Sequence, residues 1–188
     1  MSHCQTATLH CHPATISPSI RNIEVQLSLT ITGGLLLAFR LKSQIDQIHI
    51  PAPQLPAFVD GLWEHTCFEA FIAIKGNSAY REFNFSPSGQ WAAYVFSDYR
   101  QREKSTALDV APEITVRQFP ERLELDAILA PALLPSPASS ASFQIGLAAV
   151  VEATDGSRSY WALTHHATQP DFHHRDGFIL SLTPPETL

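Results

Sequence analysis

The sequence lacks the features that mark several large classes of protein. Its three cysteines, Cys4, Cys11 and Cys67, are few and odd in number in a chain of 188 residues. They exclude the disulfide framework of a small secreted domain and favour a reducing compartment. Twelve basic residues stand against 18 acidic ones, for a formal net charge of −6. Because no Lys/Arg cluster is present that would neutralise phosphates, a nucleic-acid partner is not expected.

Targeting and catalytic motifs are also missing. The first residues show no basic region followed by an apolar run, and no later segment is long and apolar enough to cross a bilayer. We therefore expect a cytoplasmic protein without membrane contact. No G-x-S-x-G, H-E-x-x-H or phosphate-binding glycine loop occurs, so no catalytic residue is assigned. The sequence leaves the oligomeric state open.

What the chain does contain is a repeated alternation of apolar and polar residues. Residues 61–96 predict three short strands in succession, separated by Gly76-Asn77 and by Pro87-Ser88-Gly89. At least five further segments have the strand pattern, and no amphipathic helix is convincing. The predicted fold is all-β, an antiparallel β-sandwich of jelly-roll-like form. We expect an irregular lead-in over residues 1–20 and one sandwich domain over 21–188.

Polar side chains of the three central strands are predicted to share one surface. If these strands are antiparallel neighbours, Glu69, Glu82, Asn84 and Tyr94 lie within cross-strand reach of one another. Trp63 precedes the first of these strands and is a candidate for stacking on an apolar sugar face, while carboxylates and amides bind hydroxyl groups. This surface predicts a small-molecule site, for which a carbohydrate is the favoured ligand.

A second group of candidates lies near the C-terminus. Imidazole and carboxylate side chains suit a metal site or acid/base chemistry. Its members are Trp161, His165, His166, Asp171, His173 and His174. Their spacing matches no zinc signature, so no metal is assigned; Trp161, His165, Asp171 and His173 are kept as ligand-binding candidates. Two alternatives stay open: a haem or metal protein that uses these histidines, and a glycoside hydrolase that uses Glu69 and Glu82.

Three runs carry a family resemblance: LWEHTCFEAFI, YREFNFSPSGQWAAYVF and YWALTHHATQPDFHHRDGFIL. Across residues 62–182 the chain resembles the bacterial DOMON-like domains, relatives of family-nine carbohydrate-binding modules and of sugar- or haem-binding DOMON domains. The resemblance implies a jelly-roll-like sandwich that binds a small ligand without chemistry of its own. By position, Trp63 and Glu69 match the family's aromatic and acidic residues before and within the first strand, and Asn84 lies in the matched N-x-S-P-S-G run.

Two departures from the family pattern bear on its cofactors. Glu64-His65-Thr66 stands where family-nine modules usually carry acidic residues, which weakens the case for calcium there. Haem-binding DOMON domains typically use a Met and a His as axial ligands, and the sole methionine of this chain is Met1. A sugar-like ligand therefore ranks above haem.

Overall fold

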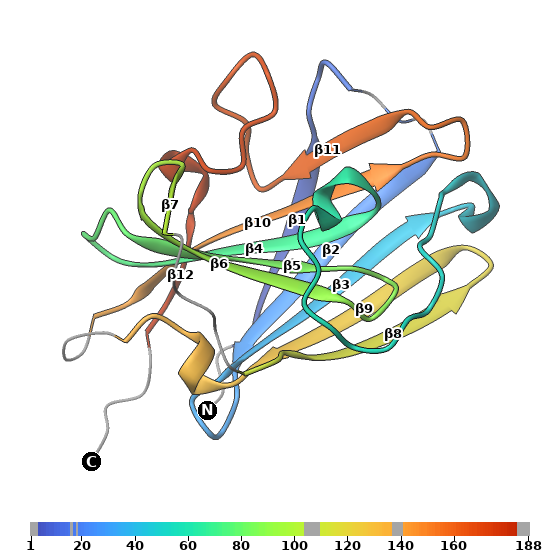
Figure 1. The fold of residues 1–188 in the computed structure, drawn as a ribbon. Helices are drawn as coiled ribbons and strands as arrows, with labels where there is room; N and C mark the ends of the chain where they lie inside the picture. Colours follow the sequence, from blue (N-terminus) through green and yellow to red (C-terminus); the bar gives the residue numbers. More distant parts are fainter. Residues whose placement is uncertain (1–3, 16, 18, 104–109, 137–140, 184–188) are drawn as a thin grey trace.

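The computed structural model describes residues 4–15, 17, 19–103, 110–136 and 141–183 and has the predicted all-β architecture (Figure 1). In the described residues, eleven strands form one antiparallel hydrogen-bonded path that folds into two layers, and a twelfth, β12, pairs with β10 off this path. The first layer contains β1 (Gln5–Cys11), β2 (Ile20–Leu29), β3 (Leu35–Ser43), β9 (Arg122–Leu129) and β8 (Glu113–Phe119). The second contains β7 (Gln101–Arg102), β6 (Trp91–Asp98), β5 (Tyr80–Phe85), β4 (Cys67–Ile74), β10 (Phe143–Glu152), β11 (Arg158–Ala162) and β12 (Leu180–Leu182).

Short 3₁₀ turns complete the described elements. They are η1 (Ile45–Gln47), η2 (Leu62–Glu64), η3 (Pro131–Leu133) and η4 (Arg175–Gly177). Within the described ranges, no helix has the length and apolarity needed to span a membrane. The β-sandwich prediction is thus confirmed, whereas the jelly-roll description stays a prediction.

The two layers enclose one apolar core, because alternate residues of each strand point inward. Val25 and Leu37 of the first layer and Phe68 of the second are completely buried. Phe39 and Phe68 meet across the layers with their ring centroids 4.9 Å apart. The inward alternation of β4, β5 and β6 agrees with the period-two pattern read from residues 61–96.

The outer face of the second layer differs from the prediction that its side chains are simply polar. A second apolar cluster lies there and includes Phe71, Ala73, Tyr80 and Phe178. The segment after β11 packs over this face and brings Phe178 onto the sheet. The face is therefore half covered, and the uncovered part holds the polar side chains.

The prediction of an irregular lead-in over residues 1–20 is wrong. Residues 5–11 form β1, which pairs with β2 along one edge and with β11 along the other. This strand joins the two layers into one path. Its pattern is weak because only Leu9 is fully buried, and the strand conformation comes from partners that are distant in the sequence.

Candidate functional site

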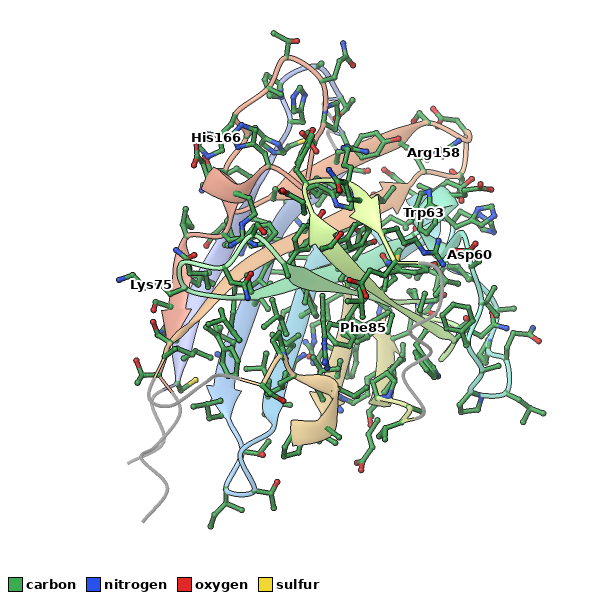
Figure 2. All side chains as sticks on the ribbon, turned by 60° about the vertical axis from the view of Figure 1, so that its left-hand side comes forward. Asp60, Trp63, Lys75, Phe85, Arg158 and His166 are labelled. Carbon is green, nitrogen blue, oxygen red and sulfur yellow. The ribbon has the colours of Figure 1, made fainter. Side chains whose placement is uncertain are left out.

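A hollow of about 360 Å³ opens on the uncovered part of the outer face of the second layer. The sheet forms its floor, while η2 and the loops around Arg100 and Phe172 form its walls. Figure 2 shows Trp63 and Arg158 on the same side of the molecule, where both line the hollow. The complete lining is Trp63, Glu69, Glu82, Tyr94, Phe96, Arg100, Val150, Arg158, Tyr160, Pro170, Phe172 and His173.

Two carboxyl groups lie in the floor. Glu69 of β4 pairs with Asn84 of β5, so Glu69 and Glu82 are diagonal neighbours on adjacent strands. The backbone positions of such neighbours are roughly 7–8 Å apart. Glu69 is 3% exposed and Glu82 is 5% exposed. Burial raises the pKa of Glu69 well above its usual range, and the nearby Glu82 raises it further. Burial also raises the pKa of Glu82 to about 7, against the effect of a hydrogen bond from Asn84.

The two carboxyl groups differ in their partners. Asn84 Nδ2 donates to Glu82 Oε1 at 2.7 Å, and His173 Nε2 lies 3.7 Å from Glu82 Oε2. Within the described ranges, the Glu69 carboxyl has no hydrogen bond to any protein group. The Glu69 oxygens are not among the fully enclosed polar atoms without a partner, so the carboxyl is reached from the hollow that it lines. The Glu69 carboxyl is therefore free to form hydrogen bonds with a ligand in the hollow.

Aromatic side chains form one wall beside this floor. The Trp63 ring meets the Tyr94 ring edge-on, with centroids 5.9 Å apart. Tyr94 O–H donates to Asp60 at 2.5 Å, and the Arg102 guanidinium lies 3.8 Å from the Tyr94 ring centroid on the ring face. Tyr94 is therefore held on three sides, while Trp63 keeps 38% of its surface exposed. A flat, accessible indole next to buried carboxyls suits a ligand with one apolar face and several hydroxyl groups.

The opposite wall depends on Asp171. Its carboxylate accepts hydrogen bonds from Tyr99 O–H at 2.6 Å, from the Arg100 guanidinium at 2.8 Å and from the His173 backbone N–H at 3.1 Å. Arg100 has a φ of 55°, a left-handed conformation that a non-glycine residue seldom adopts. These bonds fasten the loop after β6 to the loop before η4 and hold Arg100 over the hollow.

His173 is neutral in this network. The Arg100 backbone N–H donates to the Tyr80 hydroxyl at 3.1 Å, and the same hydroxyl is hydrogen-bonded to His173 Nδ1 at 2.8 Å. With the proton of the neutral imidazole on Nε2, which faces Glu82, the hydroxyl is the donor in the second bond. Burial and the Arg100 charge lower the pKa of His173 to about 4, in agreement with a neutral ring.

The structure brings together five of the nine predicted ligand-binding residues on the lining. These are Trp63, Glu69, Glu82, Tyr94 and His173. Asn84 is completely buried beneath the floor, where it bonds to Glu82. Asp171 lies behind the wall that it fastens. Tyr160, Phe172, Arg100 and Arg158 were missed, because each lies in a loop or a different strand that local periodicity does not relate to β4–β6.

The structure does not bring the C-terminal aromatic and histidine candidates together at one place. Trp161 points into the core, where its indole N–H donates to Ser159 Oγ at 2.9 Å. His165 bonds to the backbone oxygen of His10 at 2.8 Å, on the side of β1. His166 stacks on His174 with centroids 5.2 Å apart. Of these residues only His173 lines the hollow, and the histidines lie in the loop after β11, where strand alternation does not apply.

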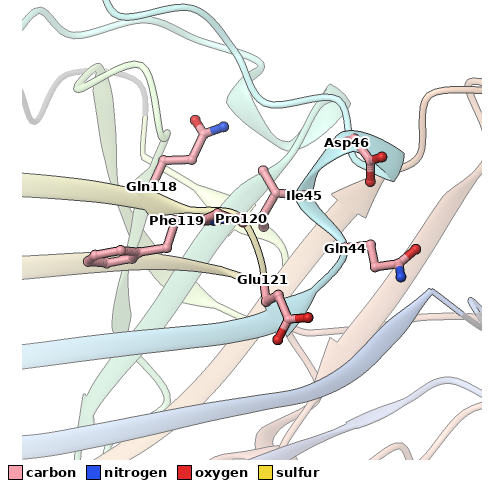
Figure 3. Close-up of a pocket in the computed structure, with 7 residues that line it drawn as sticks. All are labelled: Gln44, Ile45, Asp46, Gln118, Phe119, Pro120 and Glu121. Atoms are coloured by element: carbon pink, nitrogen blue, oxygen red, sulfur yellow. The ribbon is translucent and has the colours of Figure 1, made fainter.

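A larger hollow of about 740 Å³ lies at the turn between β8 and β9, beside η1. Figure 3 shows that the side chains of Gln44, Phe119 and Glu121 diverge from one another there. Five of its seven lining residues are exposed, and only Ile45 is buried. Binding sites depend on convergent groups more than on volume, so the smaller hollow is the candidate site.

Comparison with known proteins supports the architecture. No protein-family model matches the chain, and no curated protein matches it in sequence. Its fold matches the crystal structure, at 2.70 Å resolution, of a "putative carbohydrate-binding protein" from Bacteroides uniformis ATCC 8492. The TM-score is 0.65 at 13% identity, over 95% of this chain and 85% of that one. At this identity the likeness establishes the shared fold, and membership in the DOMON-like family stays a prediction.

Proposed function

We propose that the hollow on the outer face of the second layer binds a carbohydrate or a similar polyhydroxylated small molecule. The observation that carries the proposal is the buried Glu69 carboxyl, which has no hydrogen-bond partner in the described part of the chain and faces an aromatic-walled hollow. A sugar hydroxyl would supply that partner, and the apolar face of its ring would stack on Trp63. The printed name of the Bacteroides uniformis protein supports the same ligand class.

Calorimetric titration with mono- and oligosaccharides tests this proposal. Trp63→Ala is expected to weaken binding about tenfold or more, because stacking and area burial together contribute on the order of 1.4 kcal/mol. Glu69→Gln is expected to weaken binding without disturbing the fold. Phe119→Ala, which removes a half-buried aromatic ring from the other hollow, is the matched control and leaves affinity unchanged. No heat with any sugar, or affinity unchanged in both hollow variants, would refute the proposal.

Glycoside hydrolysis is the second candidate, favoured by one observation. Glu69 and Glu82 share the hollow with different partners, and burial raises the pKa of both carboxyls. A proton donor beside an ionisable carboxylate is the arrangement that acid-assisted glycoside cleavage uses. The test is release of a chromophore from aryl glycosides. Turnover by wild type that is lost in both Glu69→Gln and Glu82→Gln would show a hydrolase in place of a binding module. A complete lack of turnover with a bound sugar would leave a binding module.

Haem has less support, because the histidines predicted to hold it lie apart and only His173 lines the hollow. The cytoplasmic location stays a prediction.

A further inference from the structure

A separate group of three metal-binding side chains lies at the end of β10. His49 Nδ1 and His65 Nδ1 lie 2.8 Å and 2.7 Å from the same Glu152 oxygen, Oε2. One ligand atom from each of the three residues lies within 4.8 Å of the others. The two imidazole rings meet edge-on at 5.7 Å. These are the distances over which small side-chain movements would place three ligand atoms around one ion.

Backbone bonds hold the three segments in register. The His49 N–H donates to the Glu152 backbone oxygen at 2.8 Å, and Ile48 forms a β-bridge with Ala153. The buried Thr66 hydroxyl donates to the His49 backbone oxygen at 2.7 Å and accepts from the Glu152 N–H at 3.1 Å. Hydrogen bonds within the sheet therefore fix the backbone of the three residues, although both imidazole rings are about half exposed.

An ion pair alone explains this arrangement poorly. Exposed charge pairs contribute little stability and seldom fix two side chains in one geometry. Two imidazoles that converge on one carboxylate oxygen place two nitrogen donors beside an anionic oxygen donor. That donor set suits a borderline ion such as zinc, which binds His₂Glu sets in proteins, whereas calcium and magnesium prefer oxygen ligands alone.

We propose that His49, His65 and Glu152 bind one zinc ion. Three protein ligands leave a further coordination position for water or another ligand. The ion would fasten the chain just after η2, which carries Trp63, to the end of β10. This proposal goes beyond the sugar-binding proposal and does not depend on it.

Zinc titration of chelator-treated full-length protein tests the proposal. Wild type is expected to take up one more zinc equivalent than the double variant His49→Ala/His65→Ala, by calorimetry and by elemental analysis after dialysis. Each single variant, and Glu152→Gln, is expected to lower the affinity for that zinc ion by roughly tenfold or more. Calcium is expected to give no binding at this site. Cobalt(II), as a spectroscopic substitute, is expected to give the visible absorption of a site with nitrogen ligands, and the double variant loses it.

Matched controls separate this site from the other histidines and cysteines. His166→Ala/His174→Ala removes the stacked imidazole pair, and Cys4→Ser removes an exposed thiol; both are expected to keep the full zinc equivalent. Unfolding midpoints measured in chelator show that each variant is folded, and the exposed His65 ring makes His65→Ala the safest single variant. Equal zinc uptake by wild type and the double variant, or loss of the equivalent in either control, overturns the proposal.

Discussion

Replacing Glu82 with Gln tests whether its buried carboxyl keeps a proton in the folded protein. Its pKa rises from 4.5 to about 7 on folding, mainly because burial disfavours the charged form. The folded state therefore binds more protons than the unfolded state between these values, and the free energy of unfolding falls as pH rises through them. At about 1.36 kcal/mol for each pKa unit, the cost at pH 8 is about 3 kcal/mol.

His173 acts in the opposite direction, so wild type alone is not informative. Its pKa falls from 6.5 to about 4 on folding, and its contribution to stability is lost as pH drops through that range. The difference between wild type and Glu82→Gln cancels the part of the His173 contribution that does not depend on the neighbouring Glu82 carboxyl. Gln keeps a side-chain oxygen that can accept from Asn84 Nδ2 at the position where Glu82 accepts now.

Urea unfolding at pH values from 4.5 to 8 is the assay. Glu82→Gln is expected to be more stable than wild type by about 3 kcal/mol at pH 8, relative to their difference at pH 4.5. Most of that change should occur between pH 5 and pH 7. A difference that stays constant across the range would refute the reasoning, because it would mean that Glu82 ionises equally in the folded and unfolded chains.

Two further substitutions test the packing around the site. Gly146→Ala is expected to lower the free energy of unfolding by about 1–3 kcal/mol, because a Cβ there would lie 2.7 Å from the Phe178 ring. The cost should shrink in a Phe178→Leu background, and an unchanged urea midpoint in the single variant would contradict this contact. Trp161→Phe is expected to destabilise by about 0.5–1.5 kcal/mol, since it removes the indole N–H bond to the Ser159 hydroxyl, which keeps its own bond to the Val151 backbone oxygen. Ligand affinity should not change, and loss of binding at unchanged stability would return Trp161 to the site.

The strands that flank the site were predictable because their pattern is local. Alternation in β4 and β5 assigns Phe68 and Glu69 to opposite faces, and a one-residue error would have reversed both. The same alternation could not separate Glu69, which faces the hollow, from Phe71, which is covered on the same face. That distinction depends on Phe178, which packs there from a distant part of the chain.

Features built from distant segments left no readable signal. β1 has one fully buried residue, and it is a strand because β2 and β11 hydrogen-bond to its two edges. His49, His65 and Glu152 come together only when the chain before η2 docks against the end of β10. Zinc signatures read from sequence rely on short, regular spacing, and this group has none.

The position of Glu69 links the stability of the fold to its proposed function. Burial disfavours the charged form of the Glu69 carboxyl, so its ionisation costs the folded protein free energy. A hydroxyl-bearing ligand removes that cost when it binds, so the group that destabilises the free protein strengthens the complex. Stability and affinity should therefore change in opposite directions when Glu69→Gln removes the ionisable carboxyl. If the carboxyl were purely structural, its removal would lower the stability and the affinity together, because it would disturb the floor of the hollow.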